Sequence, residues 1–453
     1  MLRSSLFEPA YYTFANSERI NYWKTLENNQ YLPEKTLLDM QWRRLLELLS
    51  FAWENNIFYR SRFEVAGLNI KKIQDPNDLR KIPILSKSQV RENTSGMISN
   101  GFAVKSLKHY KTGGSTGKAL DVYLTEECSE KRNACARRSD RWTGWETGEP
   151  IAAVWGNPHR PVALKDRIKE WFLSPVIYLD TMNINPSVVK TFSEQWNRVN
   201  PSIIFGHAHS IFILAKFVKE MNLSNIRPRG ILSTSMMLLS NERRFIEEVF
   251  SVKVTDRYGC EEVSLIASEC ERHERMHLNV EHLFVEFIKE DGNPANSGEQ
   301  GKIIVTDLLN LAMPFIRYQV EDIGVPVDSK CLCGREMPMM MNVTGRVADF
   351  LIKKDGSLVA GISLIENTLT KYSGIDQMQI IQNSFEQFKI RIVPGKEYDD
   401  EVNGNLIKYF VDIFGHNICI EIEFVNNILP EISGKYRFSI CNIVNGNRYL
   451  HEA

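Results

Sequence analysis

The chain has 453 residues, of which 43% are hydrophobic and 25% charged, enough apolar material for two or three packed domains. Lysine and arginine (55) nearly balance aspartate and glutamate (56). The resulting formal charge of −1 gives no overall field that would favour nucleic acid or an anionic membrane as a partner.

The sequence also argues against export and membrane insertion. Glu8 and Pro9 interrupt the N-terminus before an apolar run can develop, which is unlike a secretory signal. The longest apolar run, from Ile211 to Ala215, is far too short to span a bilayer. Eight cysteines in a long chain without a signal predict reduced thiols or metal ligands. We therefore expect a cytoplasmic protein with no membrane span, present as a monomer or a homodimer.

The first strong pattern is helical and covers residues 34–55, directly after Pro33. Its apolar positions recur at helical spacing, which predicts one core-facing stripe. The stripe consists of Leu38, Trp42, Leu45 and Leu49. Residues 63–95 follow, with Pro76 and Pro83, and are expected to be rich in loops.

Residues 111–118, Lys-Thr-Gly-Gly-Ser-Thr-Gly-Lys, contain glycines and hydroxyls but no apolar side chain. Glycines let the backbone approach an anion, and N–H groups and hydroxyls can then donate to phosphate oxygens. The spacing differs from a P-loop, because only three residues separate Gly113 from Gly117. Alternating residues 120–125 predict a strand after this loop, where a P-loop would lead into a helix. A polar turn without function is the alternative.

In the middle of the chain, short apolar runs alternate with helical patterns, which is typical of a parallel, doubly wound sheet. The predicted strands are 151–155, 202–205, 230–233 and 252–255. The predicted helices are 188–199, 209–220 and 241–249, preceded by a helix from the expected N-cap Thr125 to about Asp140. Ligands bind beyond the carboxyl ends of such strands, so 156–159, 206–209 and 256–259 are candidate site segments. His207 and His209 are candidates for lining a pocket, although loop histidines are more often surface residues.

The pattern changes to β alternation beyond residue 278. Residues 283–287 and 303–305 are predicted strands, with a turn at 296–298 between them. The C-terminal part, about 347–453, predicts a small α+β domain. Its expected elements are strands within 380–393 and 418–424 and a helix over 406–414.

A group of cysteines and histidines has the residue types of a metal site. Cys331 and Cys333 form a close thiol pair, which is shorter than the commoner zinc-ligand spacing. Cys270 adds a third thiol upstream, and His277 or His273 adds an imidazole. Three cysteines and one histidine would form a closed, structural tetrahedron. Unpaired buried thiols are the alternative.

Five stretches in this order and spacing resemble the adenylate-forming (ANL) enzymes, and the phenylacetate–CoA ligase-like branch most of all, which includes members from capsule and antibiotic pathways. The resemblance covers nearly the whole chain. Particularly similar to that branch are Met313–Tyr318 and the Cys331–Arg335 turn. The five stretches are Thr112–Lys118, Tyr258–Glu262, Thr306–Asp322, Thr344–Asp349 and Leu429–Lys435.

The resemblance implies a role for each motif. Tyr258 would flank adenine, Asp322 would accept hydrogen bonds from the ribose, and Glu262 would hold Mg²⁺. Lys435 would stabilise the charge that develops as the carboxylate attacks the α-phosphate. Zinc would be held by Cys270, His277, Cys331 and Cys333, with His273 as the substitute for His277. The residues assigned to ATP are Thr112, Gly113, Gly114, Ser115, Thr116, Gly117, Lys118, Asp256, Tyr258, Gly259, Asp322 and Arg346.

The implied architecture is α/β. A large domain, 1–345, would bind ATP and the acid through doubly wound sheets and a β-rich subdomain. A small mobile α+β domain, 346–453, would carry Lys435 and turn about Asp349. The expected acid pocket consists of Trp155, His207, His209 and Ser233.

The implied activity is ATP-dependent formation of an acyl-adenylate from a small carboxylic acid, followed by acyl transfer. Coenzyme A is the expected acceptor, and an amine or a carrier protein is the alternative. A nucleotide-binding relic without catalysis is a more remote reading, which the presence of both Lys435 and Glu262 disfavours.

Overall fold

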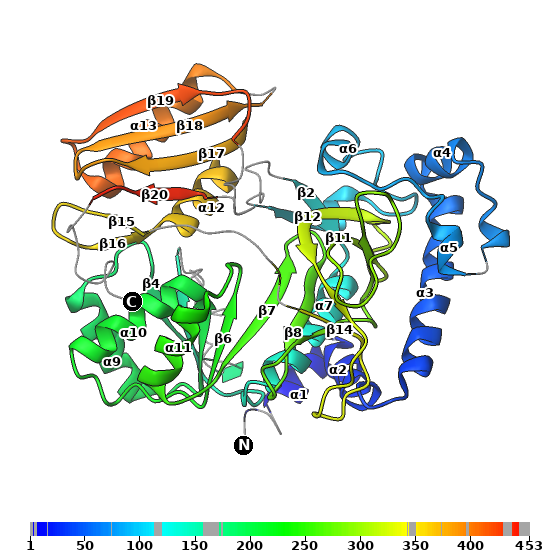
Figure 1. The fold of residues 1–453 in the computed structure, drawn as a ribbon, viewed down its shortest axis with the longest axis horizontal. Helices are drawn as coiled ribbons and strands as arrows, with labels where there is room; N and C mark the ends of the chain where they lie inside the picture. Colours follow the sequence, from blue (N-terminus) through cyan, green and yellow to red (C-terminus); the bar gives the residue numbers. More distant parts are fainter. Residues whose placement is uncertain are drawn as a thin grey trace.

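The computed structural model has a large body of sheets and helices, on which a smaller C-terminal body sits (Figure 1). The structure describes residues 3, 7–15, 17–73, 75–112, 120–156, 172–173, 175–341, 343, 350–372, 374–395, 398–428 and 437–443. Among these residues, no helix has the length and apolar character needed to cross a membrane.

A nine-stranded sheet runs through the large body in the order β13-β14-β9-β8-β7-β6-β5-β3-β4. Strands β3 to β7 are its parallel half, and helices α9, α10 and α11 pack against them around a first core. The strands are β3 (Ile151–Trp155), β4 (Val176–Asp180), β5 (Ile203–His207), β6 (Gly230–Thr234) and β7 (Val254–Cys260). The helices are α9 (Pro186–Val199), α10 (Ala208–Glu220) and α11 (Ser240–Phe250).

The other half of the same sheet is antiparallel, and β7 belongs to both halves. From β7 the pairing continues through β8 and β9 to β14 and the edge strand β13. The bounds are β8 (Ser264–Glu269), β9 (Met276–Leu278), β13 (Pro326–Val327) and β14 (Met339–Met340).

A separate three-stranded antiparallel sheet, β10-β11-β12, lies beside the N-terminal helices. Its apolar residues share a second core with the antiparallel half and with α3 and α4. The strands are β10 (Leu283–Ile288), β11 (Gly301–Asp307) and β12 (Tyr318–Gly324). The helices are α1 (Glu8–Phe14), α2 (Arg19–Asn29), α3 (Glu34–Asn55), α4 (Ile57–Val65), α5 (Pro76–Leu79) and α6 (Lys87–Glu92), with short 3₁₀ turns at Ile70–Lys72 and Val104–Ser106.

A two-stranded hairpin flanks the glycine-rich segment. Strand β1 (Lys108–Lys111) pairs antiparallel with β2 (Asp121–Leu124). Thr125 then accepts a hydrogen bond from the N–H of Cys128 and caps α7 (Glu126–Arg141), as the sequence predicts. The α7 helix packs against β8.

The C-terminal body contains a hairpin, two helices and a four-stranded mixed sheet of order β19-β18-β17-β20. It lies over α9, α10 and α11 in Figure 1, and the two bodies share the first core. Its elements are β15 (Phe350–Ile352), β16 (Leu358–Ala360), α12 (Gly361–Lys371), β17 (Ile375–Gln382), β18 (Gln387–Pro394), α13 (Asp400–Phe414), β19 (Cys419–Phe424) and β20 (Ser439–Cys441).

The predicted fold class is confirmed, including the doubly wound parallel sheet and the α+β C-terminal part. One side-chain prediction is wrong: Leu38 is 40% exposed, whereas Leu37 and Leu48 are buried, because α3 is rotated relative to the expected stripe. The sequence also did not predict β4, or that the later β segments extend the same sheet. Those pairings join residues far apart in the chain and leave no local pattern.

Candidate nucleotide and metal sites

Tyr258 and Asp322 come from different sheets and meet through a hydrogen bond. Tyr258 in β7 donates its phenolic hydroxyl to Asp322 Oδ2, 2.8 Å away. Asp322 lies in β12, where residues 320–322 stand opposite the single residue Ile303 of β11. Bulges of this kind re-aim side chains and are common beside active sites. Within the bulge, Glu321 has a φ of +69°, an unusual value for a residue with a side chain.

The turn after Tyr258 requires glycine. A Cβ at Gly259 would lie 2.5 Å from the carbonyl oxygen of Ser264, so no other residue fits without moving the backbone. The register between β7 and β8 also shifts between Tyr258 and Gly259. This close pairing orients Tyr258 and positions Glu262, which lies in the turn between β7 and β8.

Glu262 is buried and has partners from two other elements. Tyr318, in β12, donates its hydroxyl to Glu262 Oε1 at 3.0 Å. The ammonium of Lys87, in α6, lies 3.9 Å from the same oxygen. Burial alone would raise the pKa of Glu262, but the Lys87 charge and hydrogen bonds to the carboxylate outweigh it and hold the pKa below its ordinary value. Glu262 is therefore a buried carboxylate in its charged form, a suitable ligand for a hard cation.

The residues on either side of the glycine-rich segment, Thr112 and Leu120, are hydrogen-bonded to each other and form a closed base. Thr112 and Leu120 are joined by two hydrogen bonds of 2.9 Å, from Thr112 N–H to the Leu120 carbonyl and from Leu120 N–H to Thr112 Oγ1. Leu120 is buried in the second core, against which Tyr258 also packs. The two motifs therefore adjoin one core.

His207, at the carboxyl end of β5, is fully buried. Its ring lies against Trp155, with centroids 3.9 Å apart, and its Nε2 is 3.9 Å from Glu366 Oε2 of α12. Neither ring nitrogen has a hydrogen-bond partner among the described residues. Burial lowers the pKa of His207 to about 3, so the imidazole is neutral.

Ser233 and Asp256 face the opposite side of the parallel sheet. Gly206 pairs with Ser233, and Ser233 pairs with Asp256. His207 is the residue after Gly206, so its side chain points to the other face of the sheet. Asp256 Oδ1 has no hydrogen-bond partner within the described structure. Burial, followed by the neighbouring Glu269 carboxylate, raises the pKa of Asp256 to about 7. The structure thus brings Trp155 and His207 together and separates them from Ser233.

His209 is engaged by protein groups. Its Nδ1 pairs with the carboxylate of Glu242, and its ring lies 5.3 Å from that of Phe350 in β15. Glu242 also accepts from the backbone N–H of Leu239 at the start of α11. The predicted place of His209 in an acid pocket stays a prediction.

Helix α12 covers the carboxyl ends of β3 and β4. Ser363 Oγ lies 2.8 Å from Thr181 Oγ1, directly after β4. A Cβ at Gly156 would lie 2.3 Å from Ser363 Cβ, so the C-terminal body makes a very close contact at the end of β3. Sequence analysis missed Ser363 and Glu366 because nothing local links them to the strand ends.

Cys270, His277, Cys331 and Cys333 converge, with one ligand atom from each lying within 4.8 Å of all the others. Cys270 Sγ is 3.7 Å from Cys331 Sγ, and Cys333 Sγ is 3.4 Å from His277 Nε2. Three sulfurs and one imidazole nitrogen are the donor set of a closed tetrahedral zinc site. The cluster can therefore hold a metal ion.

The imidazole of this cluster is that of His277 and not His273. His277 Nδ1 lies 3.3 Å from the Met337 carbonyl oxygen, an outer contact that leaves Nε2 facing the thiols. His273 instead lies near Glu269, with 3.8 Å between Nδ1 and Oε2. Between the two candidate histidines, the geometry favours His277.

Part of the predicted site lies outside the described residues. This applies to Gly113–Lys118 of the glycine-rich segment, to Arg346 and Asp349, and to Lys435. Their roles stay predictions. Thr112, Tyr258, Gly259, Glu262 and Asp322 are described, and they lie on elements that share the second core or flank it.

Comparisons of sequence identify a matching family model and several relatives. Residues 351–442 match the family model described as the CapK C-terminal domain. The chain is 24% identical over 356 residues to the phenylacetate-coenzyme A ligase of Thermus thermophilus, covering 71% of this chain and 73% of that one. It is 25% identical over 327 residues to the enzyme of the same name from Escherichia coli K12, covering 69% and 72%.

Solved structures show the same fold. A 2-hydroxyisobutyryl-CoA ligase in complex with its acyl-AMP and CoA, in the thioesterification state, aligns over 90% of both chains with a TM-score of 0.60 and 17% identity. The same ligase in an open conformation aligns with a TM-score of 0.58. The chain therefore has the fold of the adenylate-forming ligases. Its sequence is similar to the phenylacetate-CoA ligases.

Sequence analysis provided no reason to assign a role to Lys87, Tyr318 or Glu321. Tyr318 lay in a recognised motif without a role, and Glu321 precedes Asp322. Lys87 lay in a segment expected to be loop, and no spacing connects it with residue 262. Only the fold brings Lys87 and Tyr318 to the Glu262 carboxylate, and Glu321 to Lys87.

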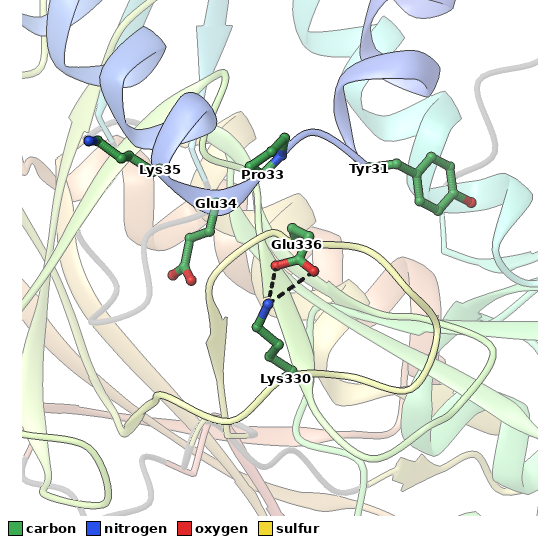
Figure 2. A pocket seen from close by; sticks show the side chains of 6 residues that line it. All are labelled: Tyr31, Pro33, Glu34, Lys35, Lys330 and Glu336. Carbon is green, nitrogen blue, oxygen red and sulfur yellow. Dashed lines mark hydrogen bonds and ion pairs between the residues drawn. The ribbon is translucent and has the colours of Figure 1, made fainter.

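A surface cleft of about 380 Å³ opens elsewhere on the large body, at the start of α3 (Figure 2). Figure 2 shows the ammonium of Lys330 facing the Glu336 carboxylate, 2.8 Å away, within the loop that carries Cys331 and Cys333. None of the residues predicted to bind nucleotide, acid or metal lines it. The lining residues are Tyr31, Pro33, Glu34, Lys35, Lys330 and Glu336.

Proposed function

We propose that this chain activates a small carboxylic acid with ATP as an acyl-adenylate and then transfers the acyl group to coenzyme A. The observation that carries the proposal is the Tyr258–Asp322 hydrogen bond beside the charged, buried Glu262, in a chain similar to phenylacetate-CoA ligases. The Tyr258 ring suits a nucleobase, the Asp322 carboxylate suits a ribose, and Glu262 suits a divalent cation.

Tyr258 offers a ring face to adenine, and Asp322 offers carboxylate oxygens to the ribose hydroxyls. The residues Thr112–Lys118 and Arg346 would hold the phosphates. The closed base at Thr112 and Leu120 supports this, because it fixes both ends of the glycine-rich segment. Asp256 and Gly259 would shape the strand end below the nucleotide.

Glu262 fits the requirement for Mg²⁺, because it is a buried carboxylate held in its charged form. When bound, Mg²⁺ would neutralise phosphate charge during loss of pyrophosphate. The protein's own contribution is to orient the Glu262 carboxylate through Tyr318 and Lys87.

Lys435 would reach the reacting carboxylate and α-phosphate and stabilise the developing charge there. We further propose that the chain divides near residue 346 and that the small domain turns about Asp349 between the two steps. The contact of α12 with the ends of β3 and β4 supports an interface between the two proposed domains at this end of the sheet.

The acid would bind near the carboxyl ends of β3 and β5, where Trp155 and the neutral imidazole of His207 meet. His209 would lie at the margin of that region, whereas Ser233 faces the other side of the sheet. A neutral imidazole can meet a polar substituent of the acid as donor or acceptor.

The acceptor is proposed as coenzyme A because the sequence relatives are named for it. Transfer to an amine or a carrier thiol is the second candidate.

We also propose that the metal of the Cys270–His277–Cys331–Cys333 cluster is a structural zinc ion. All four positions would come from the protein, which leaves none for a substrate. All eight cysteines lie within the described residues, and none of them is in a disulfide there. We propose a cytoplasmic location, where thiols stay reduced.

A panel of carboxylic acids tests the proposal. Pyrophosphate release from ATP should depend on one class of acid, and mass spectrometry should then find the acyl-CoA when coenzyme A is added. Amide formation with an added amine, and no thioester, would favour the second candidate. No acid-dependent release with any acid would count against an adenylate-forming activity.

A further inference from the structure

Lys87 is a buried lysine between two carboxylates of the proposed nucleotide site. Only 4% of it is exposed. Its Nζ lies 3.2 Å from Glu321 Oε2 and 3.9 Å from Glu262 Oε1. A buried ammonium is costly unless charges and hydrogen bonds compensate it, so this position needs both carboxylates.

The backbone that carries Lys87 is tied to the same strand as Glu321. Leu85 accepts from the N–H of Gln319 at 3.0 Å and donates to the Arg317 carbonyl at 2.8 Å, which forms a short parallel bridge to β12. Ser86 then caps α6 in a reciprocal pair with Gln89. Lys87 therefore projects from a fixed point.

Two groups from other elements act on the same oxygen of Glu262. Lys87 and the Tyr318 hydroxyl both approach Oε1. The Tyr318 hydrogen bond and the Lys87 charge together favour one orientation of the carboxylate and so set the direction of Oε2. Outer groups of this kind orient metal ligands, and their loss typically lowers metal affinity about 10- to 100-fold.

We propose that Lys87 is a positioning residue of the nucleotide site, which holds Glu262 Oε1 so that Oε2 is presented to the Mg²⁺ of MgATP. The proposal rests on the proposed function. The same ammonium also contacts Glu321, in the bulge of β12 that carries Asp322.

The test is the Mg²⁺ dependence of ATP binding, measured by calorimetry without any acid, in the full chain and in Lys87→Met. The Mg²⁺ concentration that gives half of the maximal enhancement of ATP affinity should rise about 10-fold in the variant. AMP binding without Mg²⁺ should change by less than about 2-fold, because the Tyr258–Asp322 hydrogen bond does not involve Lys87.

Lys216→Met is the matched control, because Lys216 is also buried but lies in α10, away from Glu262. It should keep the wild-type Mg²⁺ dependence. Lys87→Arg keeps the charge and should raise the Mg²⁺ requirement only about 3-fold, since its planar fork fits the two carboxylates differently. This variant decides the question if Lys87→Met does not fold.

Two results would overturn the proposal. The first is an unchanged Mg²⁺ dependence in Lys87→Met or, if that variant does not fold, in Lys87→Arg. The second is an equal loss of AMP and MgATP affinity, which would mean that Lys87 supports the site as a whole and not the cation position. Absence of ATP binding by the wild-type chain is a different outcome, which would refute the proposed function itself.

Discussion

The hydroxyl of Tyr258 and the carboxylate of Asp322 lie 2.8 Å apart, although 64 residues separate them in the chain. The hydrogen bond links β7 of the large sheet with β12 of the small one. It holds the ring and the carboxylate in place before any ligand arrives, so a nucleotide would not have to order them.

Tyr258→Phe should weaken ATP binding about 3- to 10-fold, because the ring remains but loses a hydrogen bond to a charged group. Asp322→Ala should weaken it further, since the proposed ribose acceptor is lost as well. Both affinities can be measured by calorimetry. Tyr31→Phe, an exposed tyrosine in the surface cleft, is the control and should behave as wild type. Equal affinities of Tyr258→Phe, Asp322→Ala and wild type would remove this pair from the nucleotide site.

Asp256 should make stability depend on pH. Its pKa is raised to about 7, first by burial and then by Glu269. Between the ordinary pKa of about 3.9 and about 7, the folded state keeps a proton that the unfolded chain releases, so stability falls as pH rises through this window.

Asp256→Asn removes the titrating group and should flatten this dependence. At pH 8 the variant should exceed wild type in free energy of unfolding by on the order of 2–4 kcal/mol, and at pH 4 the two should be similar. Urea unfolding of both proteins at the two pH values checks this. A difference that is the same at both pH values would show that Asp256 does not titrate in this range.

Removal of the metal should destabilise the β9–β14 region. Purified protein is expected to contain about one zinc ion per chain, and Cys333→Ser or His277→Ala should lose most of it with a lower melting temperature. Elemental analysis and thermal unfolding provide the two readouts. Cys419→Ser, which changes an exposed cysteine in β19, should keep the zinc. If the purified wild-type protein contains no zinc, and if added zinc leaves its melting temperature unchanged, a structural role of zinc is ruled out.

Gly259→Ala should destabilise the fold by about 1–3 kcal/mol, because the new Cβ would meet the Ser264 carbonyl oxygen at 2.5 Å. Gly404 provides the opposite case. It lies inside α13, and a Cβ added there would have no neighbour within 4 Å, so Gly404→Ala should stabilise by up to about 1 kcal/mol. Denaturant unfolding of both variants gives the signs, and a stable Gly259→Ala protein would show that the turn can relax.

Lys435→Ala tests the C-terminal motif. Acid-dependent pyrophosphate release should fall at least about 100-fold, the effect of removing one preorganised charge from a developing anion. ATP affinity should change much less, since the base and ribose groups remain. Unchanged pyrophosphate release would take Lys435 out of the first half-reaction.

Most elements could be predicted because their information is local. The helical spacing of 241–249, the strand runs at 151–155 and 230–233, and the Thr125 cap all depend on neighbouring residues. The cluster of three cysteines and one histidine could be predicted from residue types and a resemblance. The stripe of α3 was wrongly predicted at Leu38, because the rotation of a helix depends on what packs against it.

The sequence by itself determined the α/β class, the order of the motifs and the residue types that can hold a nucleotide and a metal. These properties follow from hydrophobic periodicity and from side-chain chemistry. Only the tertiary structure decided that Lys87 and Tyr318 meet Glu262, that Glu321 pairs with Lys87, and that His207 and Ser233 lie on opposite faces of the sheet. Such contacts depend on strand register and on pairings between distant segments, which no local pattern encodes.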